Sequence, residues 1–507
     1  MNISKFFHFL NPLIIGIFFI AFLQNNNIGE GIEISEVLSL FIIVSIFSYL
    51  VFLISTIIFK NPRKASFYSL ILLFIFFSYG YFYQLFNEIF LIKEIARHRY
   101  LVPIILIVLT IGMYKVRKNN NEYKNFHGIF FIIFTTLILV NYFMVLRYDL
   151  GPSRPVYSDI DIKIENSKNK DFPDVYHIIL DMYPTEDILN SRFGFNNENF
   201  INELTSLGFR KENLKANYQY THISIPSTTN MKHFYDSDED EKNFMNETYH
   251  SFNKSSEAFI ANKLGYKVYE ATTEDANFLS SFFSDFSKIF IRTSMVSVLD
   301  DSPLPIHNLW IIDKQKRFQD NFKLLSRTLD KDEKSWFYFY SKPPHSPFIF
   351  DENGPKKLNS SPNSIFSFKG IWDEKSKKNY IDQLKYVNKT TLEAIKNILT
   401  NNQNTIIILH SDHGIHGLDH GINNFSDDSL IDENGEISND VFQERFSTMN
   451  FTYTPDNCIG DEEKIESNIN IISTLFRECF GLNTPDNKNI KFWTPYETEE
   501  FILINEN

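Results

Sequence analysis

The sequence is poor in cysteine, with only Cys458 and Cys479 among 507 residues. Both lie near the C-terminus, and they lack the spacing of a metal-binding motif. Two cysteines also cannot build the disulfide framework of a small secreted scaffold. Two interpretations remain: a single disulfide in an exported region, or two unrelated buried thiols.

Positive charge is scarce in the C-terminal part of the chain. Residues 1–147 carry 12 Lys and Arg against 6 Asp and Glu, a net charge of +6; because the whole chain carries −13, residues 148–507 carry −19. Nucleic-acid binding depends on neutralising phosphates, so such an acidic domain is a poor candidate for it. An anionic substrate of this domain would have to be held by a metal ion or by local positive charge.

Long apolar runs are confined to the first 147 residues. A bilayer span needs about 20 mostly apolar residues. Three of the five runs meet this length, and the first and fourth are shorter but nearly free of charge. No small-residue cleavage site follows the first run, which is therefore expected to be an uncleaved helix rather than a signal peptide. The five predicted spans are 9–24, 36–59, 66–86, 100–114 and 126–146.

The distribution of Lys and Arg predicts the orientation of these spans. With the N-terminus in the cytoplasm, the inner segments hold 8 Lys and Arg and the outer segments 5, although the "KEIARHR" loop opposes this bias. An odd number of spans then places the acidic domain outside the cytoplasm. We therefore predict a transmembrane domain at 1–147, a juxtamembrane linker at 148–172 and an extracytoplasmic domain at 173–507, periplasmic or extracellular.

The acidic part contains short apolar runs rich in β-branched and aromatic residues. They are "VYHIIL" at 175–180, "SWFYFY" at 335–340 and "NTIIIL" at 404–409. Continuous apolarity predicts strands that are buried on both faces. A helical pattern at 379–400 lies between two of them. Strands alternating with helices predict an α/β domain with a mostly parallel central sheet.

Polar side chains follow each predicted strand. Asp181 follows the first, His345 lies in "SKPPHSPF" after the second, and Asp412 and His413 lie in "HSDHG" after the third. Ligands bind beyond the carboxyl ends of strands in open α/β sheets. Asp and His together form an oxygen and nitrogen ligand set of the kind that Zn or Mn accepts. These residues therefore predict a metal-assisted site.

Each of these residues also has an ordinary alternative. An aspartate after a strand is often a helix cap or turn residue. Three further histidines surround the Asp-His pair, and each is either a ligand, a substrate contact or a surface histidine. They are His410, His416 and His420.

The motifs "IILDMY", "THIS", "HSPF" and "SDHG", in this order after five spans, resemble the alkaline phosphatase/sulfatase superfamily. The layout is most similar to its membrane-anchored branch, which includes lipoteichoic acid synthase and lipid A phosphoethanolamine transferase. The resemblance covers the five helices, the linker and one sulfatase-like α/β domain. It implies that Asp181, Asp412 and His413 bind a metal ion and that His345 contacts the transferred phosphate or sulfate. Transferases of this branch usually carry Glu where Asp181 stands, whereas sulfatases carry Asp.

The same resemblance implies a nucleophile in "THISIPS", residues 221–227. Phosphoethanolamine transferases look like T-x-x-S-V-P-C, which places the nucleophile, also a metal ligand, at Thr221. Sulfatases carry C-x-P-S-R with a Cys or Ser that becomes formylglycine; threonine cannot, because its β-carbon bears a methyl group. An alternative register places the nucleophile at Ser224 and lacks the Arg. Ser227, Thr228 and Thr229 are expected at a helix start.

These observations together predict a metal-dependent transferase. It would move a phosphoethanolamine or phosphoglycerol head group from a phospholipid to an envelope glycan or lipid, through a phospho-threonine. We expect one divalent ion, Zn or Mn rather than Mg or Ca, and no nucleic-acid partner. The alternatives are a sulfatase-like hydrolase or phosphodiesterase, and a catalytically silent cell-surface module.

Overall fold

The computed structural model describes most of the chain, and the statements below concern only the described residues. The predicted linker lies almost entirely outside them. They are 6–27, 32, 34–89, 98–149, 172–273, 285–299, 306–327, 333–357, 372–416, 436–455, 458–460, 465–494 and 501–504.

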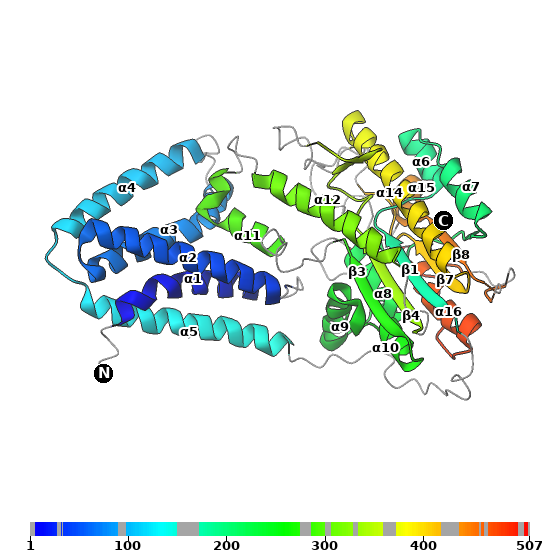
Figure 1. The fold of residues 1–507 in the computed structure, drawn as a ribbon, viewed down its shortest axis with the longest axis horizontal. Helices are drawn as coiled ribbons and strands as arrows, with labels where there is room; N and C mark the ends of the chain where they lie inside the picture. The colour runs from blue at the N-terminus through cyan, green and yellow to red at the C-terminus, as the bar shows by residue number, and fades with distance from the viewer. Residues whose placement is uncertain are drawn as a thin grey trace. The chain divides into compact units, whose positions relative to one another are not determined.

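The chain divides into two compact units, and the first contains residues 1–151 together with 276–313. Five of its helices are long and apolar enough to cross a membrane. Each predicted span lies within one of them, and Figure 1 shows α1, α2, α3 and α5 running side by side. The five are α1 (Phe7–Asn26), α2 (Ile34–Phe59), α3 (Pro62–Ile89), α4 (His98–Lys118) and α5 (Lys124–Asp149).

The first unit also contains the segment 276–313, which was predicted to lie in the acidic domain. Helix α11 (Asp285–Thr293) and the 3₁₀ helix η6 (Met295–Leu299) pack against α3. The side chains of Phe286 and Phe290 are buried in the same core as Phe77 of α3. A Cβ atom on Gly80 would lie 2.1 Å from the carbonyl oxygen of Arg292, so the α11 backbone fits only against a glycine.

The second unit, residues 152–275 and 314–507, is built on a six-stranded sheet. Its order is β2-β8-β7-β1-β4-β3. The four strands from β7 to β3 run parallel, whereas β8 and β2 are antiparallel to their neighbours. The strands are β1 (Asp174–Leu180), β2 (Arg210–Lys211), β3 (Lys267–Thr272), β4 (Ser335–Ser341), β7 (Thr405–His410) and β8 (Asn450–Tyr453).

Helices cover both faces of this sheet, which explains the continuous apolar strands. On one face, Trp336 and Ile408 share a core with residues of α8 (Thr221–Asn230), α10 (Ser256–Lys263) and α16 (Ile471–Phe480). On the other face, Phe322 of α12 (Ile306–Leu325) packs edge-on against Phe339, with ring centroids 4.7 Å apart. Because water is excluded from both faces, the strand ends are where this sheet can present polar side chains to a ligand.

The predicted fold class is confirmed: apolar helices precede an α/β domain with a mixed, mostly parallel sheet. All three predicted strands and the predicted helix exist, the latter as α14 (Glu374–Asn401). The structure also joins Cys458 and Cys479 in a disulfide, so they are not two unrelated thiols.

Candidate metal centre

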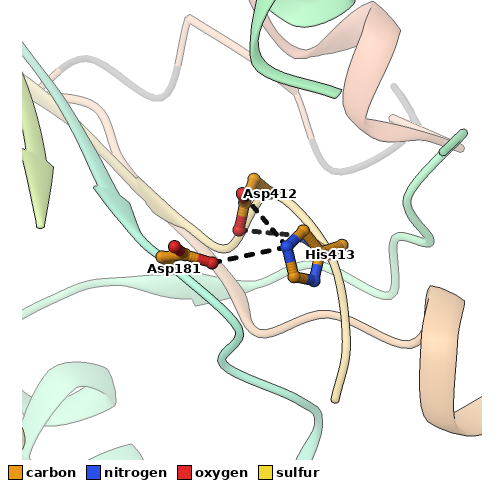
Figure 2. Close-up of side chains that lie close together, drawn as sticks. All are labelled: Asp181, Asp412 and His413. Carbon is orange, nitrogen blue, oxygen red and sulfur yellow. Dashed lines mark hydrogen bonds and ion pairs between the residues drawn. The ribbon is translucent and has the colours of Figure 1, made fainter. Parts of the chain in front are cut away.

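The ends of two strands bring together the side chains of two aspartates and one histidine. Asp181 follows β1, and Asp412 and His413 follow the neighbouring strand β7 (Figure 2). One ligand atom from each lies within 4.8 Å of the others, and all three residues are buried. The loop is tight at its next residue, since a Cβ atom on Gly414 would lie 2.0 Å from the carbonyl oxygen of Glu444.

Hydrogen bonds orient the His413 ring toward the two carboxylates. Its Nδ1 donates to the carbonyl oxygen of Gly414 at 2.7 Å, so the lone pair of a neutral ring lies on Nε2. That Nε2 faces Asp181 Oδ1 at 3.4 Å and Asp412 Oδ2 at 3.6 Å. Both oxygens are buried and have no hydrogen-bond partner. Three converging lone-pair donors with two orphaned carboxylate oxygens fit a divalent cation of the Zn or Mn type.

The two carboxylates, of Asp181 and Asp412, favour a positive charge beside them. Burial and the neighbouring Asp412 raise the pKa of Asp181 to about 7, while His413 and Lys342 oppose the shift. Two buried carboxylates at one site cannot both ionise cheaply without a cation. The other oxygen of Asp181, Oδ2, accepts a hydrogen bond from the Tyr340 hydroxyl at 2.7 Å.

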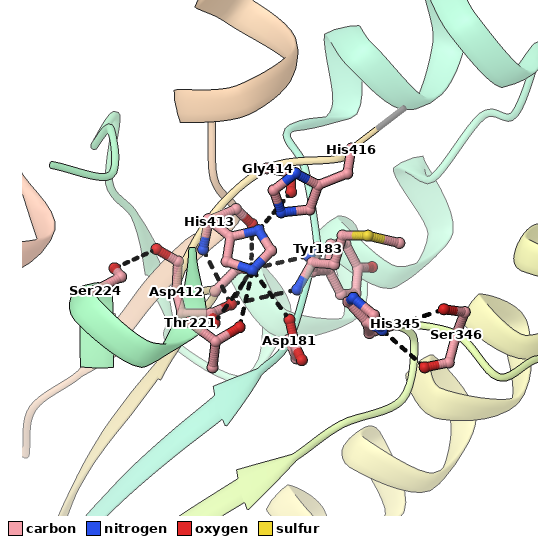
Figure 3. A network of polar contacts seen from close by, with 12 residues as sticks. Asp181, Tyr183, Thr221, Ser224, His345, Ser346, Asp412, His413, Gly414 and His416 are labelled. Atoms are coloured by element: carbon pink, nitrogen blue, oxygen red, sulfur yellow. Dashed lines mark hydrogen bonds and ion pairs between the residues drawn. The ribbon is translucent and has the colours of Figure 1, made fainter. Parts of the chain in front are cut away.

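Thr221 lies against this group of three. It is the first residue of α8, after Tyr220 in extended backbone conformation. Its Oγ1 lies 3.0 Å from His413 Nε2, as Figure 3 shows. The hydroxyl is therefore next to the predicted metal ligands and at a helix N-terminus, where backbone amides favour a bound anion.

Ser224, the rival nucleophile, has another role in the structure. It is 1% exposed, and its hydroxyl donates to the carbonyl oxygen of Asp412 at 2.6 Å. This bond stabilises the loop that holds the carboxylate. The expectation that Ser227, Thr228 and Thr229 lie at a helix start is wrong, because α8 begins at Thr221 and these three lie in its second half.

His345 lies on the loop after β4, the strand next to β1, and appears in the same close-up (Figure 3). Its Nδ1 donates to the carbonyl oxygen of Ser346 at 2.7 Å. Gln383 of α14 donates to the carbonyl oxygen of His345 at 2.9 Å. The catalytic roles of Thr221 and His345 remain predictions.

The three further histidines have different surroundings. The His416 ring stacks on Tyr220 with centroids 5.0 Å apart, and it also contacts the Arg445 guanidinium group and the His413 ring. His416 therefore borders the site. His410 is buried beneath it, where burial and His177 lower its pKa to about 3. His420 lies outside the described residues.

Two residues at this site were not predicted from the sequence. One is Tyr340, whose polar hydroxyl near the end of an apolar strand was a usable signal. His222, next to Thr221, is the other: burial and the neighbouring His413 lower its pKa to about 4, so its ring is neutral at pH 7. Its only sequence signal was its place beside the predicted nucleophile.

No protein-family model matches the chain, and no curated protein does. Several solved structures are similar to it at low identity. The C-terminal periplasmic domain of EcEptC from Escherichia coli, in complex with Zn, is 12% identical with a TM-score of 0.39, over 67% of this chain and 94% of that one. The integral membrane lipooligosaccharide phosphoethanolamine transferase A from Neisseria meningitidis is 11% identical with a TM-score of 0.36, over 93% and 95%.

A putative sulfatase from Bacteroides fragilis is also similar, at 13% identity and a TM-score of 0.37, over 63% of this chain and 81% of that one. The similar structures thus include phosphoethanolamine transferases and a putative sulfatase. Similarity at this level assigns no activity, so the function is inferred from the side chains of the site.

Proposed function

We propose that this protein is a membrane-anchored, metal-dependent transferase. It would move a phosphoethanolamine or phosphoglycerol type head group from a phospholipid to an envelope glycan or lipid through a phospho-threonine at Thr221. The observation that carries the proposal is the 3.0 Å contact between Thr221 Oγ1 and His413 Nε2 beside the buried Asp181 and Asp412.

A free threonine hydroxyl is a weak nucleophile. A divalent ion bound by Asp181, Asp412 and His413 would lower the pKa of the Thr221 hydroxyl and offset phosphate charge. The Thr221 hydroxyl would release its proton to water when the cation binds, and its oxygen would then attack the phosphorus of the lipid. One bond forms between Oγ1 and phosphorus, and the bond from phosphorus to the diacylglycerol oxygen breaks.

His345 is the residue that we assign to the leaving group. In its protonated form its imidazole ring would give a proton to the departing diacylglycerol oxygen. The neutral ring would next take the proton of the acceptor hydroxyl. The acceptor oxygen would then attack phosphorus and displace the Thr221 oxygen. The amides at the start of α8 would stabilise the phosphate charge in both steps.

The described helices of the first unit support a lipid substrate, because an enzyme anchored in the bilayer encounters its donor at high effective concentration. Large apolar side chains on them are exposed, for example Phe143 at 66% and Leu139 at 64%. Such surfaces suit a lipid environment. A donor embedded in the same membrane is therefore the substrate class that we favour.

Two observations support a domain outside the cytoplasm. Disulfides such as Cys458–Cys479 persist in oxidising compartments. In addition, the segment between β3 and β4 includes α11, which packs beside Gly80 of α3. Gly80 lies about 27 Å along α3 from Pro62, at a rise of 1.5 Å per residue. The basic residues Arg63 and Lys64 lie at the other end of α3, which the positive-inside rule places in the cytoplasm.

The test uses the full chain in phospholipid nanodiscs with Mn²⁺ or Zn²⁺. We expect diacylglycerol release that depends on the cation and on an added envelope acceptor, with the head group recovered on that acceptor. Release at the same rate without acceptor, with free head-group phosphate as product, would instead establish the hydrolase alternative. Absence of diacylglycerol release under all conditions would contradict the proposal.

A further inference from the structure

Three ionisable side chains are buried in the sheet beneath the metal centre, and the proposed reaction does not use them. Glu257 of α10, His177 of β1 and His410 of β7 are 0%, 0% and 1% exposed. His177 Nδ1 lies 2.9 Å from Glu257 Oε1, and the Nε2 atoms of the two histidines lie 2.8 Å apart. The Trp336 indole donates to Glu257 Oε1 at 2.9 Å.

The hydrogen bonds fix how many protons the three residues hold. His410 Nδ1 faces the carbonyl oxygen of Ser411 at 3.0 Å, so it must donate. A 2.8 Å contact between two Nε2 atoms needs one proton between them. A third proton must lie between His177 Nδ1 and the Glu257 carboxylate. With that proton on either the His177 ring or the Glu257 carboxylate, the three residues are neutral as a group.

This neutral trio connects the two strands that end in the metal ligands. His177 lies four residues before Asp181 on β1, and His410 two residues before Asp412 on β7. The carbonyl oxygen of Ser411, between His410 and Asp412, accepts from both the His410 ring and Asn468 Nδ2, the latter at 2.8 Å. The ring-to-ring bond therefore joins β1 to β7 below the site and holds the first peptide of the Asp412 loop.

We propose that Glu257, His177 and His410 form a positioning network that sets the spacing of Asp181 and Asp412 and thereby the cation affinity of the site. Apolar side chains would fill this space without the cost of burying polar groups. The trio instead supplies a directional bond between the strands. Hydrogen-bonded groups beyond the ligands commonly tune metal affinity in this way. The inference rests on the metal centre of the proposed function.

The role of Glu257 gives the sharpest experiment. In Glu257→Leu, His177 Nδ1 loses the carboxylate that orients its ring, and the Trp336 indole loses its acceptor. We expect Mn²⁺ affinity about tenfold below wild type in calorimetry on the full chain, together with an altered Mn²⁺ EPR spectrum. Glu257→Gln, whose amide can donate to His177 Nδ1 and accept from Trp336, should keep most of the affinity.

The matched control is Glu270→Leu. Glu270 lies in β3 and accepts hydrogen bonds from the backbone of Phe252 and from Asn253, each at 2.7 Å, so it is outside the trio. Its loss should leave affinity and spectrum unchanged. If Glu257→Leu does not fold, Trp336→Phe removes one donor to Glu257, and a smaller weakening in the same direction is expected.

The outcomes separate this inference from the proposed function, because no substrate is present. Wild-type protein that binds no divalent cation would overturn both. A wild type that binds Mn²⁺ together with a folded Glu257→Leu of equal affinity and identical spectrum would overturn the positioning network alone. Equal affinity in Trp336→Phe would do the same where that variant is used.

Discussion

The two units of this protein place polar and apolar groups in opposite ways. Among the described residues, the first unit exposes large apolar side chains such as Ile57, at 76%, whereas the second unit buries Asp181 and Asp412 at 2% and 1%. Apolar exposure is stable where lipid is the solvent, and buried charge is stable where a partner or ion compensates it. The comparison teaches that one unit has the exposed apolar surface that lipid stabilises, whereas the other has buried carboxylates that a bound cation would stabilise.

The largest expected effect concerns the nucleophile of the second unit. Thr221→Ala should lower turnover of the lipid donor by more than about 1,000-fold, because it removes the oxygen that is proposed to form the phosphorus bond. Cation binding, measured by calorimetry, should persist through Asp181, Asp412 and His413. Ser224→Ala is the matched variant, since it removes a hydroxyl one turn further along the same helix.

Ser224→Ala should keep activity and lose about 1 kcal/mol of stability, the value of one buried hydrogen bond. Both quantities are checked by turnover assays and chemical denaturation of the same preparations. An inactive Ser224→Ala beside an active Thr221→Ala would show that the alternative register is correct.

The second effect tests the buried carboxylates without a cation. The folded-state pKa of Asp181, about 7, lies above its ordinary value of 3.8. Folding therefore favours the protonated form, and the stability of the metal-free protein should fall as pH rises from about 4 to 7, by about 1.4 kcal/mol per pH unit at most. Below pH 4 this group contributes no loss, and above pH 7 the loss is complete.

Thermal unfolding of the chelator-treated protein across this pH range measures the effect. Added Mn²⁺ should reverse the loss at pH 7, because the cation replaces the missing positive charge. Asp181→Asn should flatten the pH profile and abolish the response to Mn²⁺. A thermal midpoint of the metal-free protein that rises from pH 4 to 7, equally in wild type and Asp181→Asn, would contradict this prediction. It would show that the buried carboxylates of Asp181 and Asp412 do not destabilise the metal-free protein.

The smallest effect concerns the first unit. A methyl group on Gly80 would clash with the α11 backbone, whereas one on Gly112 of α4 meets nothing within 4 Å. Gly80→Ala should therefore displace α11 and cost about 1–3 kcal/mol, while Gly112→Ala should not destabilise the protein. Limited proteolysis of the detergent-solubilised chain reports on α11 directly. Equal resistance of both variants would mean that α11 is not held by α3.

Much of this architecture is predictable because its signals are local. The spans and the strands at 175–180, 335–340 and 404–409 are apolar runs, and Asp181, Asp412 and His413 directly follow two of the strands. Parallel strands bring such residues to one edge without further information. Local patterns thus suffice for the fold class and for the metal centre as a geometric group.

Other features depend on partners far away in the sequence. The pairing of His177 with Glu257 and His410 joins residues 80 and 233 positions apart. Packing of α11 on α3 joins segments that a reading along the chain assigns to different domains. His177 inside an apolar strand was a signal of something unusual, because a buried polar residue is more informative than an apolar one. Its partners, however, were not readable from sequence.

The central claim is that Thr221 carries the transferred group. The most direct measurement is tandem mass spectrometry of the full chain, incubated with phospholipid and Mn²⁺ in the absence of acceptor and quenched in acid. We predict a head-group phosphate on Thr221 that disappears when acceptor is added and is absent from Thr221→Ala. A phosphate on Ser224, or diacylglycerol release with an unmodified segment 217–231, would contradict the account.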